Sequence, residues 1–302
     1  GNLILPSVSC ASETCLKHRR YNSSESASSV DVEFDGKPIE DVNADRDQVS
    51  IAFGTGEVTG EFVRETLCLG PQRGCVELQV VLGTEMTEDP FGLFDFDGVL
   101  GLGLSALTLD DNFGFFGQML RQSPQLQPQI GVFLARHDEG ENVVTFGGYD
   151  KTRASSELAW SPVANPDLGY WQVQIVSMRI GDVVVNDCAD GQCNAILDTG
   201  TSLLGVPRSI TRTMQRQLAR PVPQNADGTQ PIDCRTVPGL KVHFELAGGT
   251  IVSLTNEEYS KPTPLNLTLP NRDPSWQLYC RSLLLPVDIE EPLSKKTFIW
   301  GE

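Results

Sequence analysis

The sequence predicts a mostly β protein made of two similar lobes. Segments in which apolar and polar residues alternate outnumber segments with a helical period. The 302 residues include 28 glycines and 19 prolines, which favours many turns and few long helices. A chain of this length has room for two domains or one large one, and two stretches of it resemble each other, as in a duplicated lobe.

Alternating residues predict a β-hairpin near the middle of the first lobe. Residues 48–53 alternate with period two, Gly54-Thr55-Gly56 follows as a turn, and residues 58–63 return as the second strand. Further strands are predicted over residues 76–82, 143–146, 170–180 and 241–246. Helical signals are few: Ile210, Met214 and Leu218 repeat at i, i+4 and i+8 behind a candidate N-cap at Ser209, and Phe113, Phe116 and Leu120 indicate a second short helix.

The duplication rests on two landmarks. Residues 1–6 align with residues 202–207: both begin with a small residue and share a leucine third, an aliphatic residue fifth and a proline sixth. Gly101 ends a Val-Leu-Gly sequence after the first copy, and Gly301 ends an Ile-Trp-Gly sequence after the second at nearly the same separation. We therefore expect an N-terminal lobe over residues 1–152 and a C-terminal lobe over residues 153–302.

The repeat also predicts which residues precede Gly1 and follow Gly301 in the sequence. An Asp-Thr-Gly-Thr sequence ends directly before Ser202, whereas the chain starts at the equivalent Gly1. If the lobes are copies, an Asp-Thr-Gly-Ser/Thr sequence stands just before Gly1, and a strand continues after Gly301. We expect the chain to be truncated at both ends.

Eight cysteines favour disulfides and a secretory route. They fall as Cys10/Cys15, Cys68/Cys75, Cys188/Cys193 and Cys234/Cys280. Zinc is the alternative, but the short pairs lie far apart in the sequence and no histidine stands near them at a ligand spacing. Sequons at Asn22 and Asn266 agree with secretion.

The charge excludes some classes of partner. With 23 basic and 40 acidic residues, the net charge is −17, which repels nucleic acid and anionic membranes. The longest apolar stretch, residues 98–109, is too short and too rich in glycine to span a bilayer. The acid-rich segments 31–47 and 138–141 are expected as solvated loops, and His18, His137 and His243 stand in polar or mixed contexts.

Asp198 stands in the motif that carries chemistry. Asp198-Thr199-Gly200-Thr201-Ser202 follows a short apolar run, so the carboxylate lies at the end of a buried strand. The glycine allows a close backbone approach, and the hydroxyls can hydrogen-bond the carboxylate. Two such loops facing each other would hold two carboxylates that share one proton. The ionised member can take a proton from water while the protonated member donates to a carbonyl oxygen, which hydrolyses an amide. A lone Asp-Thr-Gly is otherwise an ordinary turn.

Over nearly its whole length the sequence resembles the pepsin-like family of aspartic endopeptidases. The resemblance is carried by Asn2, Leu3, Pro6, Ser7, Cys10, Cys15 and residues 21–24, 54–56, 96–102, 146–148, 169–172 and 196–204. It implies a bilobal fold of two pseudo-symmetric β lobes with the active-site cleft between them. Asp198 would be one catalytic aspartate, its partner lying before Gly1, and Thr199, Gly200, Thr201 and Ser202 would support the dyad.

The resemblance also assigns the substrate region. Phe53, Gly54, Thr55 and Gly56 would form a flap over the substrate, and Gly101 and Gly301 would end strands that pack beneath the two loops. Phe91, Phe96 and Val99 map to the pocket before the scissile bond, and Tyr170 and Ile196 to the side after it, although such residues in a β core are also ordinary packing. The family has disulfides at Cys10–Cys15, Cys188–Cys193 and Cys234–Cys280, whereas Cys68–Cys75 would be an extra bridge.

Two departures concern the flap. The family usually has tyrosine at the position of Phe53 and tryptophan at the position of Ile4, and those two side chains are hydrogen-bonded there. Because both are replaced together, neither polar group is left buried and unpaired. Plain packing of an edge hairpin is the alternative role for Phe53.

The resemblance implies an endopeptidase that acts on an extended peptide or protein substrate. It would need no cofactor or metal, would bind statine-type inhibitors such as pepstatin, would be a monomer and would not bind nucleic acid. We expect a secretory, extracellular, vacuolar or lysosome-like location. The alternative is a catalytically inactive pepsin-fold binding protein whose first aspartate has been lost. A β-rich sugar-binding or adhesion domain would leave the repeat unexplained. With a single dyad aspartate, the chain as given is expected to be inactive.

Overall fold

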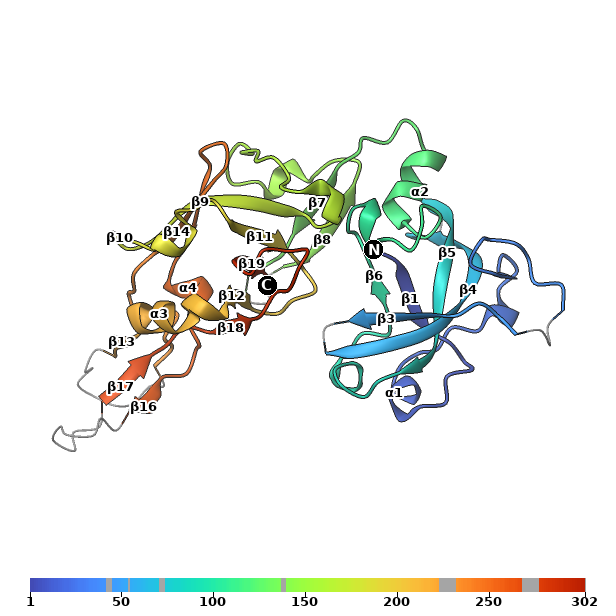
Figure 1. The fold of residues 1–302 in the computed structure, drawn as a ribbon, viewed down its shortest axis with the longest axis horizontal. Coiled ribbons are helices and arrows are strands. Elements are labelled where there is room, and N and C mark those ends of the chain that lie inside the picture. The colour runs from blue at the N-terminus through green and yellow to red at the C-terminus, as the bar shows by residue number, and fades with distance from the viewer. Residues whose placement is uncertain are drawn as a thin grey trace. The chain divides into compact units, whose positions relative to one another are not determined.

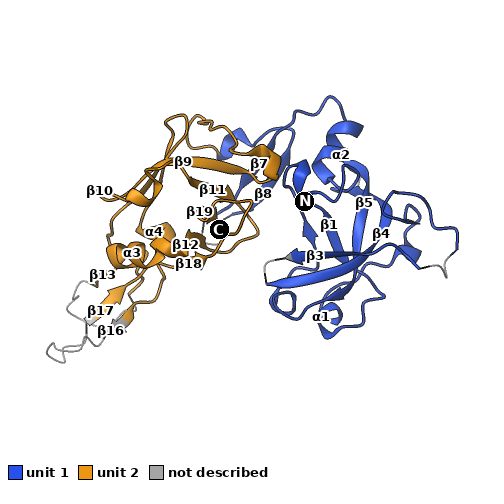
Figure 2. Ribbon diagram, viewed as in Figure 1, with its two compact units in different colours: residues 1–153 blue, residues 154–302 orange. Residues whose placement is uncertain are grey.

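The structure is a computed structural model that describes residues 1–41, 45–53, 55–70, 74–136, 140–222, 232–267 and 277–301. The chain divides into two compact units, Gly1–Arg153 and Ala154–Glu302 (Figure 2). Both units consist mainly of β-strands, so the mostly β prediction is confirmed. None of the described helices is long and apolar enough to cross a membrane. The expectations for Gly54, the Phe53 side chain, His137, residues 138–139 and the Asn266 sequon fall outside what the structure describes.

Unit 1 is built on one sheet in the strand order β2-β4-β5-β1-β6, with β3 paired to β4 (Figure 1). The strands are β1 (Leu3–Pro6), β2 (Val30–Val32), β3 (Val49–Phe53), β4 (Gly56–Cys68), β5 (Cys75–Met86) and β6 (Val99–Leu100). A separate pair is formed by β7 (Ile130–Phe133) and β8 (Val143–Phe146). The helices are α1 (Glu13–Leu16) and α2 (Phe115–Gln122), and the 3₁₀ turns are η1 (Ser23–Glu25), η2 (Phe91–Leu93), η3 (Ser105–Leu107) and η4 (Lys151–Arg153).

Unit 2 is built on a larger sheet in the order β15-β14-β9-β11-β19-β12-β18, with β10 paired to β9. Its strands are β9 (Gln172–Ile180), β10 (Val183–Val184), β11 (Cys193–Leu197), β12 (Leu204–Pro207), β14 (Val242–Leu246), β15 (Ile251–Leu254), β18 (Leu284–Val287) and β19 (Thr297–Trp300). A small sheet contains β13 (Arg220–Pro221), β17 (Gln277–Cys280) and β16 (Leu265–Leu267). The helices are α3 (Arg208–Leu218) and α4 (Asn256–Tyr259), with 3₁₀ turns η5 (Pro166–Leu168) and η6 (Asn186–Cys188).

The alternation of side chains along the strands determines which faces of the sheets are buried. In β5, Leu78 and Val80 belong to one apolar cluster, and their neighbour Val81 belongs to a second cluster. The unit 1 sheet is therefore buried on both faces at its centre, because successive side chains of a strand point to opposite faces. In unit 2 a single large cluster includes Phe298 of β19 and Met214 of α3.

The predicted helices are present, with two corrections. Phe116 and Leu120 lie in α2, but Phe113 lies in the turn before it, and the buried side of α2 carries Phe115 and Met119 instead. Ile210, Met214 and Leu218 lie on the buried side of α3. The predicted cap at Ser209 is wrong, because the N-cap is Pro207 and it makes no side-chain hydrogen bond. The sequence analysis missed α1 and α4. The signal for α4 was readable, since Thr255 and Glu258 form a capping box.

The internal repeat has the same strand register in both copies. Strand β1 pairs antiparallel with β6 and parallel with β5, and β12 pairs antiparallel with β19 and parallel with β18. In the first copy Leu3 lies opposite Leu100, and in the second the equivalent Leu204 lies opposite Trp300. The equality of register supports a true duplication, because an accidental hexapeptide match would not fix strand partners.

The two copies differ at one sheet edge. Strand β19 lies between β12 and β11, and β11 leads into Asp198. Its counterpart β6 is the last strand of its sheet and, among the described residues, pairs only with β1. Among the described residues of unit 1, no strand pairs with β6 in the way that β11, the strand before the Asp-Thr-Gly sequence, pairs with β19 in unit 2.

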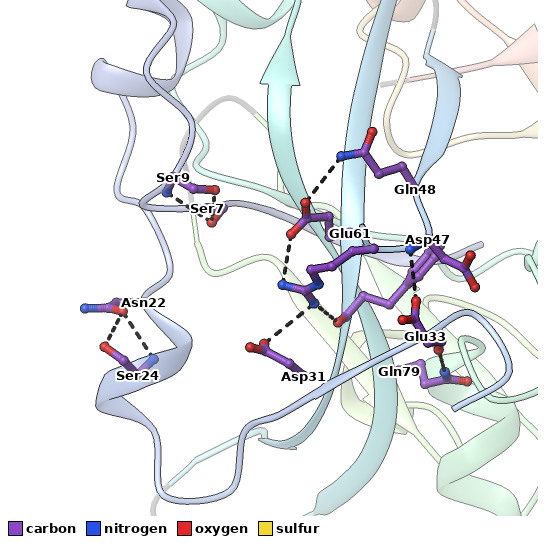
Figure 3. Close-up of polar contacts among 12 residues, drawn as sticks. Ser7, Ser9, Asn22, Ser24, Asp31, Glu33, Asp47, Gln48, Glu61 and Gln79 are labelled. Carbon is purple, nitrogen blue, oxygen red and sulfur yellow. Dashed lines mark hydrogen bonds and ion pairs between the residues drawn. The ribbon is translucent and has the colours of Figure 1, made fainter. Parts of the chain in front are cut away.

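The expectation of a solvated loop over residues 31–47 is wrong for part of that segment. Asp31 of β2 and Glu61 of β4, both labelled in Figure 3, share Arg46 as an ion-pair partner. The Arg46 guanidinium lies 2.9 Å from the Glu61 carboxylate and 3.7 Å from that of Asp31, and it donates to the Phe62 carbonyl at 2.7 Å. Opposite charges and the Phe62 carbonyl thus give these residues defined partners. Residues 42–44 lie outside the described part.

Candidate active site

Asp198 lies directly after β11 and is held by its own loop. Its N–H donates to the Trp300 carbonyl of β19 at 3.0 Å, which continues the parallel pairing of β11 and β19. One carboxylate oxygen, Oδ1, accepts from the Gly200 N–H at 2.9 Å, and Oδ2 accepts from the Thr201 hydroxyl at 2.7 Å. Each oxygen therefore has a fixed donor, which orients the carboxylate of a half-buried side chain.

The other two predicted supporting residues make no such bond. Thr199 and Ser202 are exposed, and neither hydrogen-bonds the Asp198 carboxylate among the described contacts. Close backbone contacts explain why the residue after β19, Gly301, is a glycine. A Cβ atom at this position would lie 2.1 Å from the Thr201 carbonyl oxygen and 2.6 Å from that of Leu203. The loop after Asp198 therefore packs directly on the Gly301 backbone.

The hairpin predicted around residues 53–56 is present in unit 1. Strands β3 and β4 pair antiparallel, with Phe53 opposite Gly56. Gly56 is buried, and a Cβ atom there would lie 2.5 Å from Thr87 Oγ1 and 2.6 Å from the Asp89 carbonyl oxygen. The Thr55 hydroxyl donates to the Asp89 carboxylate at 2.9 Å. The hairpin tip is thus fixed against residues 87–90.

An apolar recess in unit 1 brings together three of the predicted pocket residues. Phe91, Phe96 and Val99 line it, and the Phe94 ring stacks on Phe96 at 4.5 Å and meets Phe91 edge-on at 6.1 Å. The remaining lining residues are Ile4, Pro6, His18, Val58, Met86, Phe94, Asp97 and Gly98. Its walls suit an apolar side chain, and Ile4 occupies the place where the resemblance expects a tryptophan.

The sequence analysis missed most of these additional lining residues. The spacing of Phe91, Phe94 and Phe96 could have identified Phe94. No local pattern links His18 to this segment, because their contact joins residues 73 positions apart.

The other two predicted pocket residues belong to unit 2. Ile196 is buried in β11, opposite Gln172 of β9 and Ile299 of β19. Tyr170 is half-buried just before β9, and its carbonyl accepts from the Gln172 N–H at 2.9 Å. Their pocket role stays a prediction.

All eight cysteines are joined in disulfides, so the prediction of disulfides rather than zinc ligands or free thiols is confirmed. The bridges are Cys10–Cys15, Cys68–Cys75, Cys188–Cys193 and Cys234–Cys280. Within the described residues, no three His, Cys, Asp or Glu side chains gather as metal ligands would.

Comparison with known proteins identifies the family. The family model described as "Eukaryotic aspartyl protease" matches residues 1–264. The chain belongs to the eukaryotic aspartyl protease family. It is 31% identical to pepsin A of Callithrix jacchus over 242 residues, covering 80% of this chain and 57% of that protein. It is 32% identical to cathepsin E of Rattus norvegicus over 271 residues, covering 87% of this chain and 61% of that protein.

A further relative covers almost all of this aspartyl protease chain. Cathepsin E of Mus musculus is 31% identical over 301 residues, which is 97% of this chain and 66% of that protein. The chain spans about three fifths of the length of the first curated relatives it matches. It covers 57% of pepsin A from each of two mammals. Family membership thus agrees with the resemblance found in the motifs around Asp198.

Proposed function

We propose that the protein to which this chain belongs is an aspartic endopeptidase, and that Asp198 is one of its two catalytic aspartates. The observation that carries the proposal is the Asp198 loop. Its carboxylate stands at the end of a buried parallel strand, with one donor on each oxygen at 2.9 Å and 2.7 Å. Such fixed donors hold a carboxylate in one orientation before the substrate arrives, which is what general acid–base work requires.

The second aspartate is proposed to precede Gly1 by four residues. Two observations support this position. The repeat aligns Gly1 with Ser202, and Asp198 precedes Ser202 by the same interval. The sheet of unit 1 ends at β6, where the equivalent strand β19 of unit 2 has β11 as a further neighbour. A strand ending in Asp-Thr-Gly at that edge would complete the symmetry of the two copies.

The proposed chemistry follows from two adjacent carboxylates. Like charges a few Å apart do not both ionise, so the pair holds one shared proton. The ionised member takes a proton from a water molecule, which attacks the peptide carbonyl carbon. The protonated member donates its proton to the carbonyl oxygen, which gives a tetrahedral diol. The aspartate that took the proton from water then gives it to the amine nitrogen while the other aspartate accepts a proton from a diol hydroxyl, so the C–N bond breaks and the amine leaves. The water and the two aspartates suffice, so the mechanism requires no cofactor or metal.

The substrate is proposed to be an extended peptide segment of a protein. The hairpin of β3 and β4 would cover it as a flap, and the recess at Phe91, Phe96 and Val99 would take an apolar side chain. Statine-type inhibitors such as pepstatin would bind because their hydroxyl group takes the place of the attacking water. Since both aspartates come from one chain, the proposal needs no second copy, and we expect a monomer.

The location is proposed to be the secretory pathway or a compartment reached through it. Four disulfides form and persist in oxidising surroundings and are uncommon in the cytosol. An extracellular, vacuolar or lysosome-like destination would also suit a catalytic pair that must hold a proton.

The test compares the full-length protein with two matched variants. Asp198→Asn removes the carboxylate charge, and Asp182→Asn makes the same change at an exposed turn of unit 2. We expect the parent and Asp182→Asn to cleave a peptide at acid pH. Pepstatin should inhibit this cleavage and a chelator should not affect it. Asp198→Asn should fold but lose cleavage. Residues 1–302 expressed alone should be inactive. Activity that survives Asp198→Asn would contradict the proposal, and a folded parent that binds pepstatin without cleaving would favour the binding-protein alternative.

A further inference from the structure

His18 lines the recess and contacts the segment that forms its aromatic wall. Its side chain is only 5% exposed, and its Nε2 lies 3.0 Å from the Phe91 carbonyl oxygen. A carbonyl oxygen only accepts hydrogen bonds, so Nε2 carries the proton and donates it. The same carbonyl also accepts from the Phe94 N–H at 3.2 Å, which closes the 3₁₀ turn η2.

The neighbouring residue Arg19 holds the other end of the same segment. Its backbone N–H donates to Asp97 Oδ1 at 2.8 Å, and its guanidinium Nε lies 3.6 Å from Asp97 Oδ2. Two consecutive residues thus bind both ends of segment 91–97. Between these ends lie the stacked rings of Phe94 and Phe96.

The loop that carries His18 and Arg19 is itself held in place. The Cys10–Cys15 disulfide lies just before it, and the His18 N–H donates to the Cys15 carbonyl at 3.2 Å. Displacing His18 would therefore require movement of a cross-linked turn. In contrast, Phe96 is 48% exposed, so little apolar burial fixes the outer part of the wall.

We propose that His18 is a positioning residue for substrate binding, which through the Phe91 carbonyl sets the shape of the recess and so its selectivity for an apolar side chain. This inference rests on the proposed function, because it assigns the recess to substrate. His18 takes no part in the proton transfers of the proposed reaction. Its removal should therefore act on binding and selectivity rather than on the chemical step.

The experiment uses the full-length protein and two series of otherwise identical peptides, one with phenylalanine and one with alanine before the scissile bond. His18→Leu removes the donor, and His18→Gln keeps an N–H donor at the corresponding reach. His243→Gln is the matched control, because His243 bonds Ser253 on the unit 2 sheet. We expect His18→Leu to lose about tenfold in kcat/KM for the phenylalanine peptide, mainly through KM, because one buried hydrogen bond is lost. We expect little change for the alanine peptide, recovery in His18→Gln and no change in His243→Gln.

A second readout separates this inference from the proposed function. Binding of the phenylalanine peptide to Asp198→Asn and to the double variant His18→Leu/Asp198→Asn needs no catalysis, and hydrogen exchange of residues 91–97 reports the anchor directly. We expect about tenfold weaker binding and faster exchange in the double variant. Two results would overturn the role of His18 even if cleavage depends on Asp198. One is an equal loss of kcat/KM for the phenylalanine and alanine peptides in His18→Leu. The other is equal peptide binding and equal hydrogen exchange in Asp198→Asn and in the double variant. If His18→Leu fails to fold, His18→Gln decides the question. Because this variant keeps an N–H donor, a loss of about tenfold in its kcat/KM for the phenylalanine peptide would contradict the inference.

Discussion

At the scale of single residues, the two oxygens of Asp198 have different donors. Oδ1 is bound by the Gly200 backbone N–H, which every substitution except proline keeps, although a Cβ there would lie 3.2 Å from that oxygen. Oδ2 is bound by the Thr201 hydroxyl, which a substitution can remove. Thr199 stands beside them without such a bond, so the two threonines of one motif are distinguishable by experiment.

Thr201→Ala should lower kcat/KM of the full-length enzyme by about tenfold to a hundredfold, because a charge-assisted hydrogen bond to a catalytic carboxylate is lost. Thr201→Ser should retain most activity, since it keeps the hydroxyl. Steady-state cleavage of one peptide by Thr201→Ala, Thr201→Ser and Thr199→Ala measures the difference. A larger loss in Thr199→Ala than in Thr201→Ala would contradict the hydrogen-bond assignment.

Glu65 of β4 makes a pH-dependent contribution to stability. Burial alone raises the pKa of its carboxyl, but hydrogen bonds from the hydroxyls of Ser28, Tyr21 and Ser26 and from the Thr66 N–H outweigh burial and hold the pKa below its ordinary value. A carboxyl with a lowered folded-state pKa stabilises the fold above its unfolded pKa, and that stability is lost as the pH falls through the folded pKa. Glu65→Gln should therefore destabilise the protein more at pH 6 than at pH 2. Urea unfolding of both proteins at the two pH values tests this, and an equal difference at both would contradict it.

At the scale of elements, the hairpin tip depends on a glycine. Gly56→Ala should destabilise the full-length protein by about 1–3 kcal/mol, because the new Cβ would meet backbone and side-chain atoms of residues 87–90. Gly117→Ala is the matched control, since a Cβ at this exposed position of α2 meets nothing within 4 Å. It should stabilise the protein by about 0.5–1 kcal/mol, as alanine does in a helix interior. Urea unfolding compares the three proteins, and similar effects of the two substitutions would refute the packing argument.

Element types were predictable where one face of a strand is apolar, and less so elsewhere. Alternation identified β3 and β14 to within one residue. It stopped at residue 63 for β4, which continues to Cys68, because the next three residues, Arg64, Glu65 and Thr66, are all polar and carry no alternation. The helices α1 and α4 span four residues each, about one turn, which is too short for a period of 3.6 residues to appear.

At the scale of the whole molecule, the four disulfides close loops of very different length. Cys234–Cys280 spans 46 residues and Cys10–Cys15 spans 5. In the loop-entropy account the long bridge contributes about 4 kcal/mol and the short one about 2 kcal/mol. Replacing both cysteines of the long bridge by serine should therefore cost more stability than the same change at the short bridge. Urea unfolding of the two double variants tests this order, and its reversal would contradict it.

The repeat made the general architecture predictable, but not the details of the sites. Nearly equal spacing between Gly1 and Gly101 and between Ser202 and Gly301 predicted equivalent strands, and the register bears this out. The Asp198 loop was predictable because its bonds join residues within three positions. The anchor from His18 to Phe91 was not, since it depends on how distant segments of unit 1 pack.

Asp198 is proposed to work as one of a pair, and comparing single and double variants distinguishes a pair from a lone carboxylate. In the full-length protein, the residue four before Gly1 and Asp198 are each changed to asparagine, singly and together, and kcat is measured with one peptide. The account predicts that the first position is an aspartate, that each single change lowers kcat by about 10³-fold or more, and that the double variant is no worse, because groups that act as one unit are not additive. Two modest effects that multiply in the double variant, or a residue without a carboxylate at that position in an active enzyme, would contradict the account.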